Sequence, residues 1–426
     1  MHVVIIGGGI GGLCLAQGLV KAGVSVAVYE RDAAPDARLQ GYRLNIEPQG
    51  SRALHACLPD HLWQILVATA GDPGPGMGVF TEGMRELMRE DGPPAGLDPA
   101  VSTHAVSRVS LRGLLLAGLD EVVHFGKEFQ RYRHEADGSV TAEFADGSTA
   151  NGTLLVGADG GRSRVRRQLL PAAVTTALPA FGVGGKVPLT DRTASWLPEA
   201  LTRSKNMVLP QRDFLFTAVF RRREQPEELA ERMRDQVAAA GLDTKTVLAD
   251  VTDDDYVMWA YVAHRRHIGE DLTGQALLDR VDVRMRDWDP GLRALLSATP
   301  AETVDRFDFS TARRVAPWPT TTVTVLGDAI HHMPPVGGLG GNAALHDALL
   351  LRDAITDVHD GRSALLPALR GYEAAMLTSG FGSVRQARLY VALAISPSRV
   401  LRTVARGFFR LCGAIGPLRR VIFQDG

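Results

Sequence analysis

The sequence predicts an α/β fold in which an open parallel sheet is assembled from discontinuous segments of the chain. Three glycine-rich signatures, Gly7–Gly12, Gly157–Gly160 and Gly327–Ala329, each follow a short apolar run that is typical of a buried parallel strand. Between the second and third signatures, residues 181–299 contain runs of aromatic and β-branched residues such as Phe214–Phe220. These runs predict a second sheet that is inserted into the first domain.

The composition is that of a globular protein with enough apolar residues for two hydrophobic cores. Hydrophobic residues make up 45% of the 426 residues, and the formal net charge is -1. A near-neutral chain lacks the basic surface of a nucleic-acid-binding protein, and no apolar run is long enough to cross a bilayer. Three cysteines, Cys14, Cys57 and Cys412, are odd in number and irregular in spacing, which excludes a disulfide framework and a cysteine zinc site. We therefore expect a cytoplasmic protein, a monomer or homodimer, without nucleic-acid partners.

The first signature has the form of a strand that turns directly into a helix. The strand Val3–Ile6 needs Gly7 at the turn, and Gly9 allows the backbone to approach a pyrophosphate closely. The helix that begins near Ile10 offers unpaired N–H groups and a positive dipole end, and Gly12 lets this helix pack on the strand. A glycine-rich turn that serves only packing is the alternative.

A second strand, Val24–Tyr29, delivers Glu30 and then Arg31 at its carboxyl end. In a βαβ unit, a carboxylate at this position accepts hydrogen bonds from the ribose hydroxyls of an adenosine. The same carboxylate repels a 2′-phosphate. The adenosine bound here therefore belongs to FAD or NAD and not to NADP.

The third signature opens the most specific motif in the chain. A strand over Thr322–Leu326 ends at Gly327 and Asp328, and a loop rich in proline and glycine leads to a helix that begins near Asn342. The amino end of that helix can stabilise the negative charge that a flavin gains at its pyrimidine edge on reduction. An ordinary strand-to-helix turn is the alternative, but it leaves Asp328 and the paired prolines without a role.

The three signatures, in this order and at these separations, resemble the single-component FAD-dependent aromatic hydroxylases of the para-hydroxybenzoate hydroxylase type. The resemblance extends from Met1 to about Ala354. It implies a Rossmann-type FAD-binding domain assembled from discontinuous segments, an inserted substrate domain on a mainly antiparallel sheet, and a C-terminal helical segment. The expected limits are 1–75, 100–180 and 300–375 for the FAD-binding domain, 76–99 and 181–299 for the substrate domain, and 376–426 for the C-terminal helices.

The resemblance also implies which residues contact FAD. They are Gly7, Gly9, Ile10, Gly12, Glu30, Arg31, Arg112, Asp159, Gly327, Asp328, Pro335, Gly338, Gly340, Gly341 and Asn342. Arg112 and Asp159 each have an alternative role, because surface arginines usually solvate a helix and aspartate before glycine usually forms a turn. A basic cluster, Arg162, Arg164, Arg166 and Arg167, is expected to form a solvated helix face, and contact of one or two of them with a nicotinamide phosphate is the alternative. A glutamine that is common in the family loop is Leu339 here, so backbone donors must hold the flavin edge.

The chemistry that the resemblance implies belongs to the flavin. NAD(P)H reduces FAD, O2 adds to give a C4a-hydroperoxyflavin, and one oxygen atom passes to an aromatic or polycyclic small molecule. Only one dinucleotide fingerprint is present, so the nicotinamide nucleotide binds transiently. Arg43 lies in a segment that resembles the one beside the isoalloxazine, and we expect it to help position the flavin. Epoxidation, Baeyer–Villiger oxygenation and a non-catalytic flavin-binding role are the alternatives.

The candidate residues of the substrate pocket are mostly aromatic. They are Tyr42, Phe216, Met258, Trp259, Tyr261 and Pro334. Strand alternation places Trp259 and Tyr261 on one face and Met258 on the other, so at most one set can line a pocket, and aromatic residues on a sheet more often belong to the core. The adjacent His331 and His332 lack further ligands at metal-binding spacing, so we expect no metal. We expect His331 to fix its loop by hydrogen bonding.

The segment Ser398–Phe423 combines apolar residues at near-helical spacing with several arginines. A basic amphipathic helix of this kind can lie on a membrane surface. Packing of its apolar face on the FAD-binding domain is the alternative. We expect no integral membrane segment, and we favour packing over peripheral membrane contact.

Overall fold

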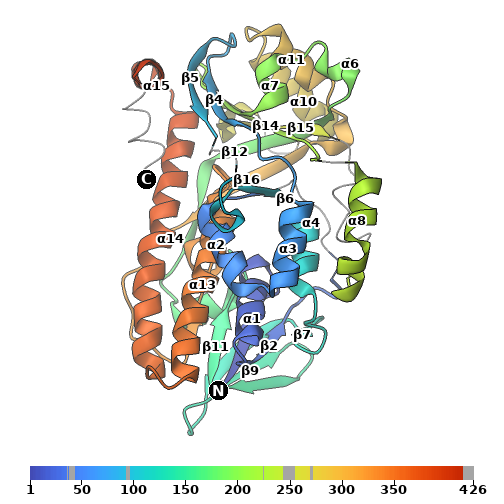
Figure 1. Cartoon of the computed structure of the whole chain (residues 1–426). Coiled ribbons are helices and arrows are strands. Elements are labelled where there is room, and N and C mark those ends of the chain that lie inside the picture. The colour runs from blue at the N-terminus through green and yellow to red at the C-terminus, as the bar shows by residue number, and fades with distance from the viewer. Residues whose placement is uncertain are drawn as a thin grey trace.

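The computed structural model of the chain contains two large sheets, which lie at opposite ends of the molecule and are joined by long strands and helices (Figure 1). The structure describes residues 1–35, 37, 44–92, 96–223, 225–242, 255–268 and 272–415. Tyr42 and Arg43 lie outside the described residues. The arrangement confirms the predicted α/β fold.

The first large sheet has five parallel strands in the order β17-β11-β1-β2-β7. They are β1 (His2–Ile6), β2 (Ser25–Tyr29), β7 (Val123–His124), β11 (Leu154–Gly157) and β17 (Val323–Val325). The helices of this part are α1 (Ile10–Lys21), α2 (Pro48–Cys57), α3 (Asp60–Thr69), α4 (Arg108–Leu116), α5 (Arg164–Leu169), α12 (Asp328–His331), α13 (Leu339–His359) and α14 (Leu365–Ile395). Strands β11 and β17 are fully buried and β1 is buried after His2, which explains their continuous apolar or β-branched runs.

Two small sheets flank the parallel sheet. One is formed by β8 (Phe129–His134), β9 (Val140–Phe144) and β10 (Thr149–Gly152), and the other by β3 (Leu44–Ile46) and β6 (His104–Val106). Helix α4 begins after Ser107, whose hydroxyl accepts the N–H groups of Val109 and Ser110. This N-cap fixes the start of the helix.

The second large sheet has seven strands in the order β16-β12-β15-β14-β13-β4-β5, and every pair is antiparallel except β13 with β4. They are β4 (Gly76–Phe80), β5 (Glu86–Asp91), β12 (Thr175–Pro188), β13 (Lys205–Val208), β14 (Phe214–Phe220), β15 (Tyr256–His264) and β16 (Asp305–Ala312). The helices in these stretches of chain are α6 (Asp191–Ala194), α7 (Glu199–Arg203), α8 (Pro226–Ala239), α10 (Gly274–Arg284) and α11 (Pro290–Ser297), and α15 (Arg399–Ala414) follows α14. Residues of α10 and α11 form a separate hydrophobic core with one face of this sheet.

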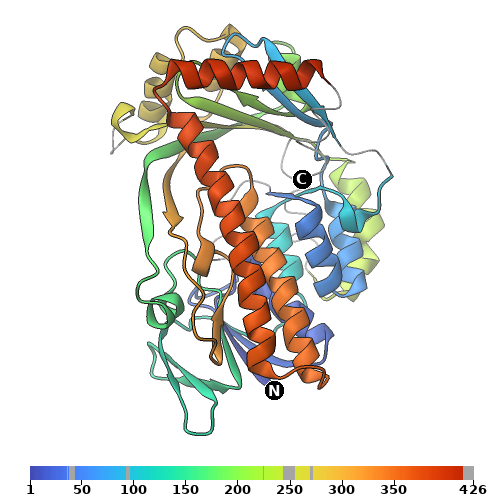
Figure 2. The same ribbon diagram turned by 90° about the vertical axis from the view of Figure 1, so that its left-hand side faces the viewer.

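Strands β12 and β16 and helix α14 do not follow the predicted domain limits. Strand β12 begins at Thr175 and crosses the limit predicted at residue 180, and β16 belongs to the antiparallel sheet although it lies within residues 300–375. Helix α14 runs from the parallel-sheet end of the molecule to the antiparallel sheet (Figure 2). The division into domains therefore stays a prediction, because shared elements leave no single boundary.

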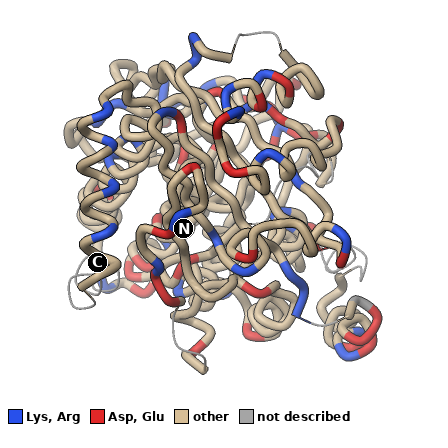
Figure 3. The backbone as a smooth tube through the Cα atoms, turned by 90° about the horizontal axis from the view of Figure 1, so that it is seen from above, with Lys and Arg blue, Asp and Glu red and all other residues tan. Residues whose placement is uncertain are grey.

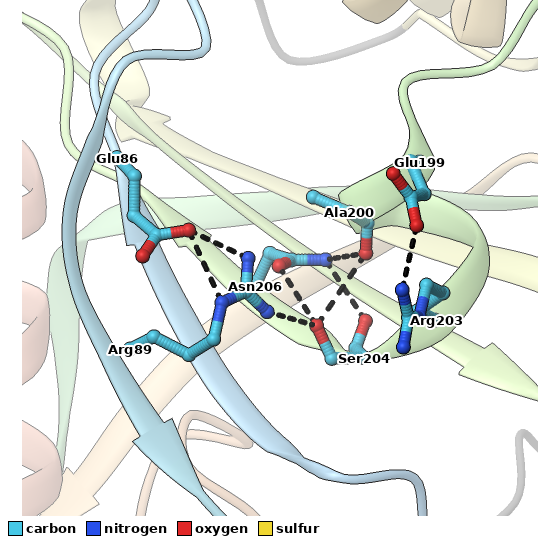
Figure 4. A network of polar contacts seen from close by, with 7 residues as sticks. All are labelled: Glu86, Arg89, Glu199, Ala200, Arg203, Ser204 and Asn206. Atoms are coloured by element: carbon cyan, nitrogen blue, oxygen red, sulfur yellow. Dashed lines mark hydrogen bonds and ion pairs between the residues drawn. The ribbon is translucent and has the colours of Figure 1, made fainter.

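A polar network fastens the β4–β5 hairpin to the rest of its sheet (Figure 4). Arg89 on β5 donates to the Glu86 carboxylate at 2.7 Å and to the Ser204 hydroxyl at 3.5 Å. The buried Asn206 on β13 donates to the carbonyl oxygens of Ala200 and Ser204, each at 2.8 Å. The Arg89–Ser204 contact joins β5 to the end of α7, and the Asn206 bonds join β13 to the same segment.

Helix α14 packs closely on the short helix α12 at Gly380. A Cβ atom at this position would overlap the imidazole ring of the buried His331. The absence of a side chain therefore allows the two helices to approach.

Among the described residues, no helix combines the length and apolar character that a bilayer-spanning segment requires.

We predict that Gly380→Ala destabilises the protein by about 1–3 kcal/mol, because the new methyl group overpacks the space that His331 occupies. Gly371→Ala is the matched control, since it lies on the same helix and its Cβ would meet no atom within 4 Å. It should stabilise the helix by up to about 1 kcal/mol. Urea denaturation of both variants measures the difference, and equal stability of the two would contradict this account of the packing.

Candidate active site

The three glycine-rich signatures meet at one edge of the parallel sheet. Strands β1, β11 and β17 are neighbours and run in the same direction, so their carboxyl ends lie together. The turns stay in contact after the strands end, because Ala158 N–H donates to Ile6 at 2.7 Å and Leu326 N–H donates to Gly157 at 3.0 Å. In open α/β sheets, the carboxyl edge is where ligands bind.

The first glycine loop is shaped by two close contacts and one open position. Gly7 has φ +111°, and a Cβ there would overlap the carbonyl group of Ala158. A Cβ on Gly12 would overlap the carbonyl oxygen of Gly7, so α1 packs directly on the turn. A Cβ on Gly9 would meet nothing within 4 Å. Helix α1 has neither a side-chain cap nor an acidic residue in its first turn, which leaves its first N–H groups from Ile10 onward available to an anion.

Two charged side chains hold Gly8 from opposite sides. The buried Glu30 carboxylate accepts the Gly8 N–H at 2.7 Å and the Asp32 N–H at 2.9 Å. Arg112 on α4 donates to the Gly8 carbonyl and, at 3.3 Å, to the Pro35 carbonyl. Arg112 therefore orders the glycine loop and does more than solvate its helix.

Arg31 follows Glu30 and its side chain is exposed. The resemblance alone supports a role for it in cofactor binding.

Asp159 in the second signature caps the start of α5. One carboxylate oxygen accepts the N–H groups of Arg164 and Val165, at 2.7 Å and 3.3 Å. The other oxygen, Oδ1, is buried without a hydrogen-bond partner, and burial raises the pKa of Asp159 although its hydrogen bonds oppose the shift. This geometry favours the turn-forming alternative and leaves one oxygen free for a ligand.

Arg166 joins the second signature to the third. Its side chain is buried, and it donates to the carbonyl oxygens of Ala329 at 2.7 Å and Gly161 at 3.1 Å. The expectation of a fully solvated basic helix face is therefore wrong for Arg166. The two carbonyl oxygens compensate for the water that the guanidinium loses.

A buried ion pair fixes the third signature. Gly327 has φ +62°, and its N–H donates to Asp347 Oδ2 at 2.8 Å. The same oxygen lies 2.6 Å from Nε2 of His331, which is fully buried. Burial by itself would lower the pKa of His331, but the charge and hydrogen bond of Asp347 raise it overall. The expected loop-fixing role of His331 is confirmed, with Asp347 as a partner that the sequence analysis missed.

Asp328 presents a carboxylate next to the loop that follows it. Oδ1 is buried and has no hydrogen-bond partner, while Oδ2 lies 3.5 Å from Nδ1 of His332. Burial lowers the pKa of Arg108 on α4, and the charge of Asp328 opposes this shift, so Arg108 lies within electrostatic range of the site. The sequence analysis missed Arg108, which adjoins the N-cap of a helix with no motif of its own.

The loop before α13 is open at its glycines. Gly338, with φ +67°, is the N-cap residue, and α13 begins at Leu339, three residues before the predicted start. Cβ atoms on Gly338 and Gly341 would each meet nothing within 4 Å, and one on Gly340 would lie 3.8 Å from Asp328 Oδ1. Helix α13 has no side-chain cap and no acid in its first turn. Its free N–H groups therefore face a space that small residues leave open.

Asn342 ties the start of α13 to the segment around β3. Its amide donates to the carbonyl oxygens of Asn45 and Gly338, each at 3.0 Å, and its oxygen accepts the Glu47 N–H at 2.9 Å. Pro335 in the preceding loop is exposed. Asn342 thus has a structural role in addition to the predicted contact with a cofactor.

The structure separates the predicted pocket residues. Trp259 and Tyr261 are fully buried on the face of β15 that packs on α10 and α11, where they donate to Thr299 and Asp213. This placement removes both from the predicted pocket wall. Phe216 lies on the opposite face of the sheet.

The remaining two candidates also lie away from that core. Met258 is partly buried beside Phe216, and Pro334 is buried in the loop of the third signature. Strand alternation therefore leaves Phe216 and Met258, and not the larger Trp259, on the face that can adjoin a ligand.

Comparison with known proteins accounts for nearly the whole chain. A family model described as an FAD binding domain matches residues 69–271 and 296–374, and a model of an NAD(P)-binding Rossmann-like domain matches residues 5–67. A solved structure from Photorhabdus luminescens subsp. laumondii TTO1, assigned as an FAD-containing monooxygenase, has 33% identity and a TM-score of 0.79. The match covers 92% of this chain and 98% of that one.

The chain belongs to the family of FAD-dependent monooxygenases. It is 32% identical over 394 residues to the dual O-methyltransferase/FAD-dependent monooxygenase CTB3 of Cercospora beticola, but it spans only 44% of that longer protein. It is 28% identical to the FAD-dependent monooxygenase thnD of Trichoderma harzianum, with coverage of 92% of this chain and 93% of the relative. Klebsiella pneumoniae HpxO, solved with FAD and uric acid, shares the fold at a TM-score of 0.75 and 21% identity, over 96% of this chain and 93% of its own.

The residues at the sheet edge fit the FAD of this family. The open positions at Gly9, Gly338 and Gly341 provide space that a side chain would fill, and the amino ends of α1 and α13 provide donors for a pyrophosphate and a flavin edge. The unpaired Oδ1 atoms of Asp159 and Asp328 are buried acceptors that hydroxyl groups of a cofactor can satisfy. The site thus offers both donors and acceptors to one elongated ligand.

We predict that Arg112→Ala weakens FAD binding roughly tenfold to hundredfold, because loss of a charge-assisted hydrogen bond to the Gly8 carbonyl loosens the glycine loop. Flavin fluorescence titration of the apoprotein measures the dissociation constant. Arg131→Ala is the control, since that arginine is 71% exposed and pairs with Glu143 on the surface. An unchanged dissociation constant in Arg112→Ala would contradict the role assigned to it.

We predict that Asp347→Asn destabilises the protein by about 3–5 kcal/mol, because it leaves His331 buried without its counter-ion. The raised pKa of His331 makes this loss dependent on pH. The pair contributes fully below the unfolded histidine pKa of about 6.5, and its contribution falls as pH rises through the higher folded value. The gap between wild type and variant should therefore narrow from pH 6 to pH 9 in urea denaturation.

Asp357→Asn is the control for this series, because Asp357 lies on the same helix and pairs with Arg362 at the surface. Its effect should stay within about 1 kcal/mol at every pH. A stability gap for Asp347→Asn that does not vary with pH would contradict the charged His331–Asp347 pair.

Proposed function

We propose that the chain is an FAD-dependent monooxygenase that uses NAD(P)H and O2 to hydroxylate an aromatic or polycyclic small molecule. The observation that carries this proposal is the position of the third signature, whose loop touches both the FAD site and the antiparallel sheet. Val336 in that loop packs against a buried apolar cluster that includes Phe214 and Val262 of the sheet. A ligand on that face of the sheet would lie beside the flavin edge.

The chain's own residues divide the work of holding the cofactor. In this proposal, Gly7, Gly9, Ile10 and Gly12 bind the pyrophosphate, and Glu30 and Arg31 adjoin the adenosine. Arg112 orders the loop, while Asp159 and Asp328 accept hydrogen bonds from the ribityl side. Gly327, Pro335, Gly338, Gly340, Gly341 and Asn342 shape the turn and the loop at the flavin edge. FAD supplies the redox chemistry when bound: it takes a hydride from NAD(P)H and activates O2 for transfer of one oxygen atom.

The apolar face of the antiparallel sheet supports an aromatic substrate. Four partly buried residues, Met207, Phe216, Phe307 and Val336, pack against a buried cluster that includes Val391 of α14. Such a surface binds flat rings and excludes water, which limits wasteful release of hydrogen peroxide. We assign the substrate side of the site to this sheet, within residues 76–99 and 181–299. The uric acid bound by HpxO supports a ring compound as the substrate class.

In this proposal, Tyr42, Met258 and Pro334 also line the substrate pocket. Arg43 helps to position the flavin. Met258 and Pro334 are compatible with this assignment through their places on the sheet face and in the loop. Tyr42 and Arg43 rest on the resemblance alone. Epoxidation and Baeyer–Villiger oxygenation use the same flavin chemistry and are distinguished from hydroxylation by the product.

We predict that phenolic or polycyclic ring compounds accelerate reduction of the bound flavin by NADH or NADPH. Anaerobic stopped-flow absorbance measures this rate with and without each compound. After addition of 18O2, mass spectrometry should find one labelled oxygen atom in the product, and NMR should show whether it is a hydroxyl, an epoxide or an inserted ester oxygen. A flavin that neither nucleotide reduces with any compound, or that yields only hydrogen peroxide, would contradict the proposal and favour a non-catalytic flavoprotein.

Phe216→Leu tests the placement of the substrate in the same assay. It should raise KM roughly tenfold while flavin content stays constant, because it alters the substrate face and leaves the cofactor loops intact. Phe125→Leu is the matched variant, a partly buried phenylalanine packed against the core of the parallel sheet. Equal effects of the two substitutions on KM would contradict the placement of the substrate.

A further inference from the structure

Helix α15 differs from an ordinary amphipathic surface helix in the face that it turns toward the protein. It lies across one end of the molecule, on the outside of the antiparallel sheet (Figure 2), and contacts β5. The face that meets the protein contains arginines, and the face that meets solvent is apolar. Packing of its apolar face on the FAD-binding domain, which the sequence analysis favoured, is therefore wrong.

The inward arginines are fully engaged with backbone carbonyl groups. Arg402 is buried and donates to Pro210 at 2.9 Å, Asp213 at 2.8 Å and Ala394 at 2.7 Å. Arg406 donates to the Leu209 carbonyl at 2.8 Å and also pairs with a glutamate on the β4–β5 turn. These bonds fix the rotation of the helix about its axis. The apolar residues cannot turn inward without breaking them.

The outward face is a continuous apolar stripe over the whole helix. It consists of Val400, Leu401, Val404, Phe408, Leu411 and Ile415, with exposures of 74%, 42%, 62%, 43%, 50% and 42%. Contact of such a stripe with water is unfavourable in proportion to its apolar area, so a stripe held in this position favours a partner that covers it.

Exposed positive charge lies near both ends of the helix, at Arg399 and Arg410. Helix α15 contains four arginines and no acidic residue, and Figure 3 shows basic residues and no acidic ones along it. At its amino end lies a depression of about 610 Å³ lined by several cations. They are Arg212, Arg266, Arg284 and Arg399. Among the described residues that line the depression, Asp213 is the one acid, and it is neutralised by Arg284 at 2.6 Å.

We propose that α15 is a docking surface for an anionic lipid bilayer, with the apolar stripe among the acyl chains and the arginine-lined depression against acidic headgroups. A bilayer of this kind complements both features at once. A second copy of the chain that paired through the same face would bring Arg399 and Arg410 toward like charges. The charge pattern therefore favours the lipid surface over self-association.

Flotation of the full-length protein with vesicles tests the proposal. Vesicles of phosphatidylcholine mixed with phosphatidylglycerol should carry the protein, vesicles of phosphatidylcholine alone should carry little of it, and 0.5 M salt should release it. Leu401→Asp and Val404→Asp should each reduce partitioning roughly tenfold. Arg399→Glu should reduce it roughly tenfold on the anionic vesicles.

Matched controls separate docking from general effects of the substitutions. Leu366→Asp places the same change on a leucine of equal exposure, 42%, at the far end of α14, and Arg131→Glu reverses a charge on an exposed strand. Circular dichroism and flavin content confirm that each variant is folded. Absence of binding to anionic vesicles, equal binding to neutral ones, or a dimer that Val404→Asp dissociates without any vesicle binding would each overturn the proposal.

Discussion

The candidate site depends on the close contact between the ends of three neighbouring parallel strands. Gly7 and Gly12 allow the first turn to pack against its own helix and against Ala158 of the second turn, with no room for a side chain at either glycine. Arg166 then bonds the second turn to the third through Ala329. Segments that are more than 100 residues apart in the chain are thus held at one sheet edge, and the donors and acceptors of each are presented to one ligand.

The same edge shows how charge is used to order backbone. Glu30 and Arg112 hold opposite sides of the Gly8 peptide, and the His331–Asp347 pair holds the N–H of Gly327. Each of these side chains forms a hydrogen bond with a backbone group of a turn. The side of the turn that faces the ligand stays free. The open positions at Gly9, Gly338 and Gly341 are consistent with this arrangement. The loops are held by bonds on the side away from the ligand, so they need no side chains on the ligand side.

Much of this organisation could be predicted from the sequence, because glycine turns after apolar strands have few structural solutions. The strands β1, β11 and β14 and the role of Gly7 follow from local pattern. Local pattern could not find Arg108, Arg166 or Asp347 as parts of the site, because their partners lie on distant segments or in another signature. For α15, the periodicity shows which face is apolar but not which face packs on the protein. The hydrogen bonds of Arg402 place the arginine face against the protein, which is the opposite of the expected orientation.

Hydrogen–deuterium exchange of the apoprotein and the FAD-loaded protein tests the central claim, that one cofactor engages all three signatures. The account predicts that FAD protects peptides covering residues 7–13, 157–165 and 327–345 together, while α11 in the far core exchanges at the same rate in both forms. Protection confined to the first signature, with the second and third unchanged, would contradict the single shared site.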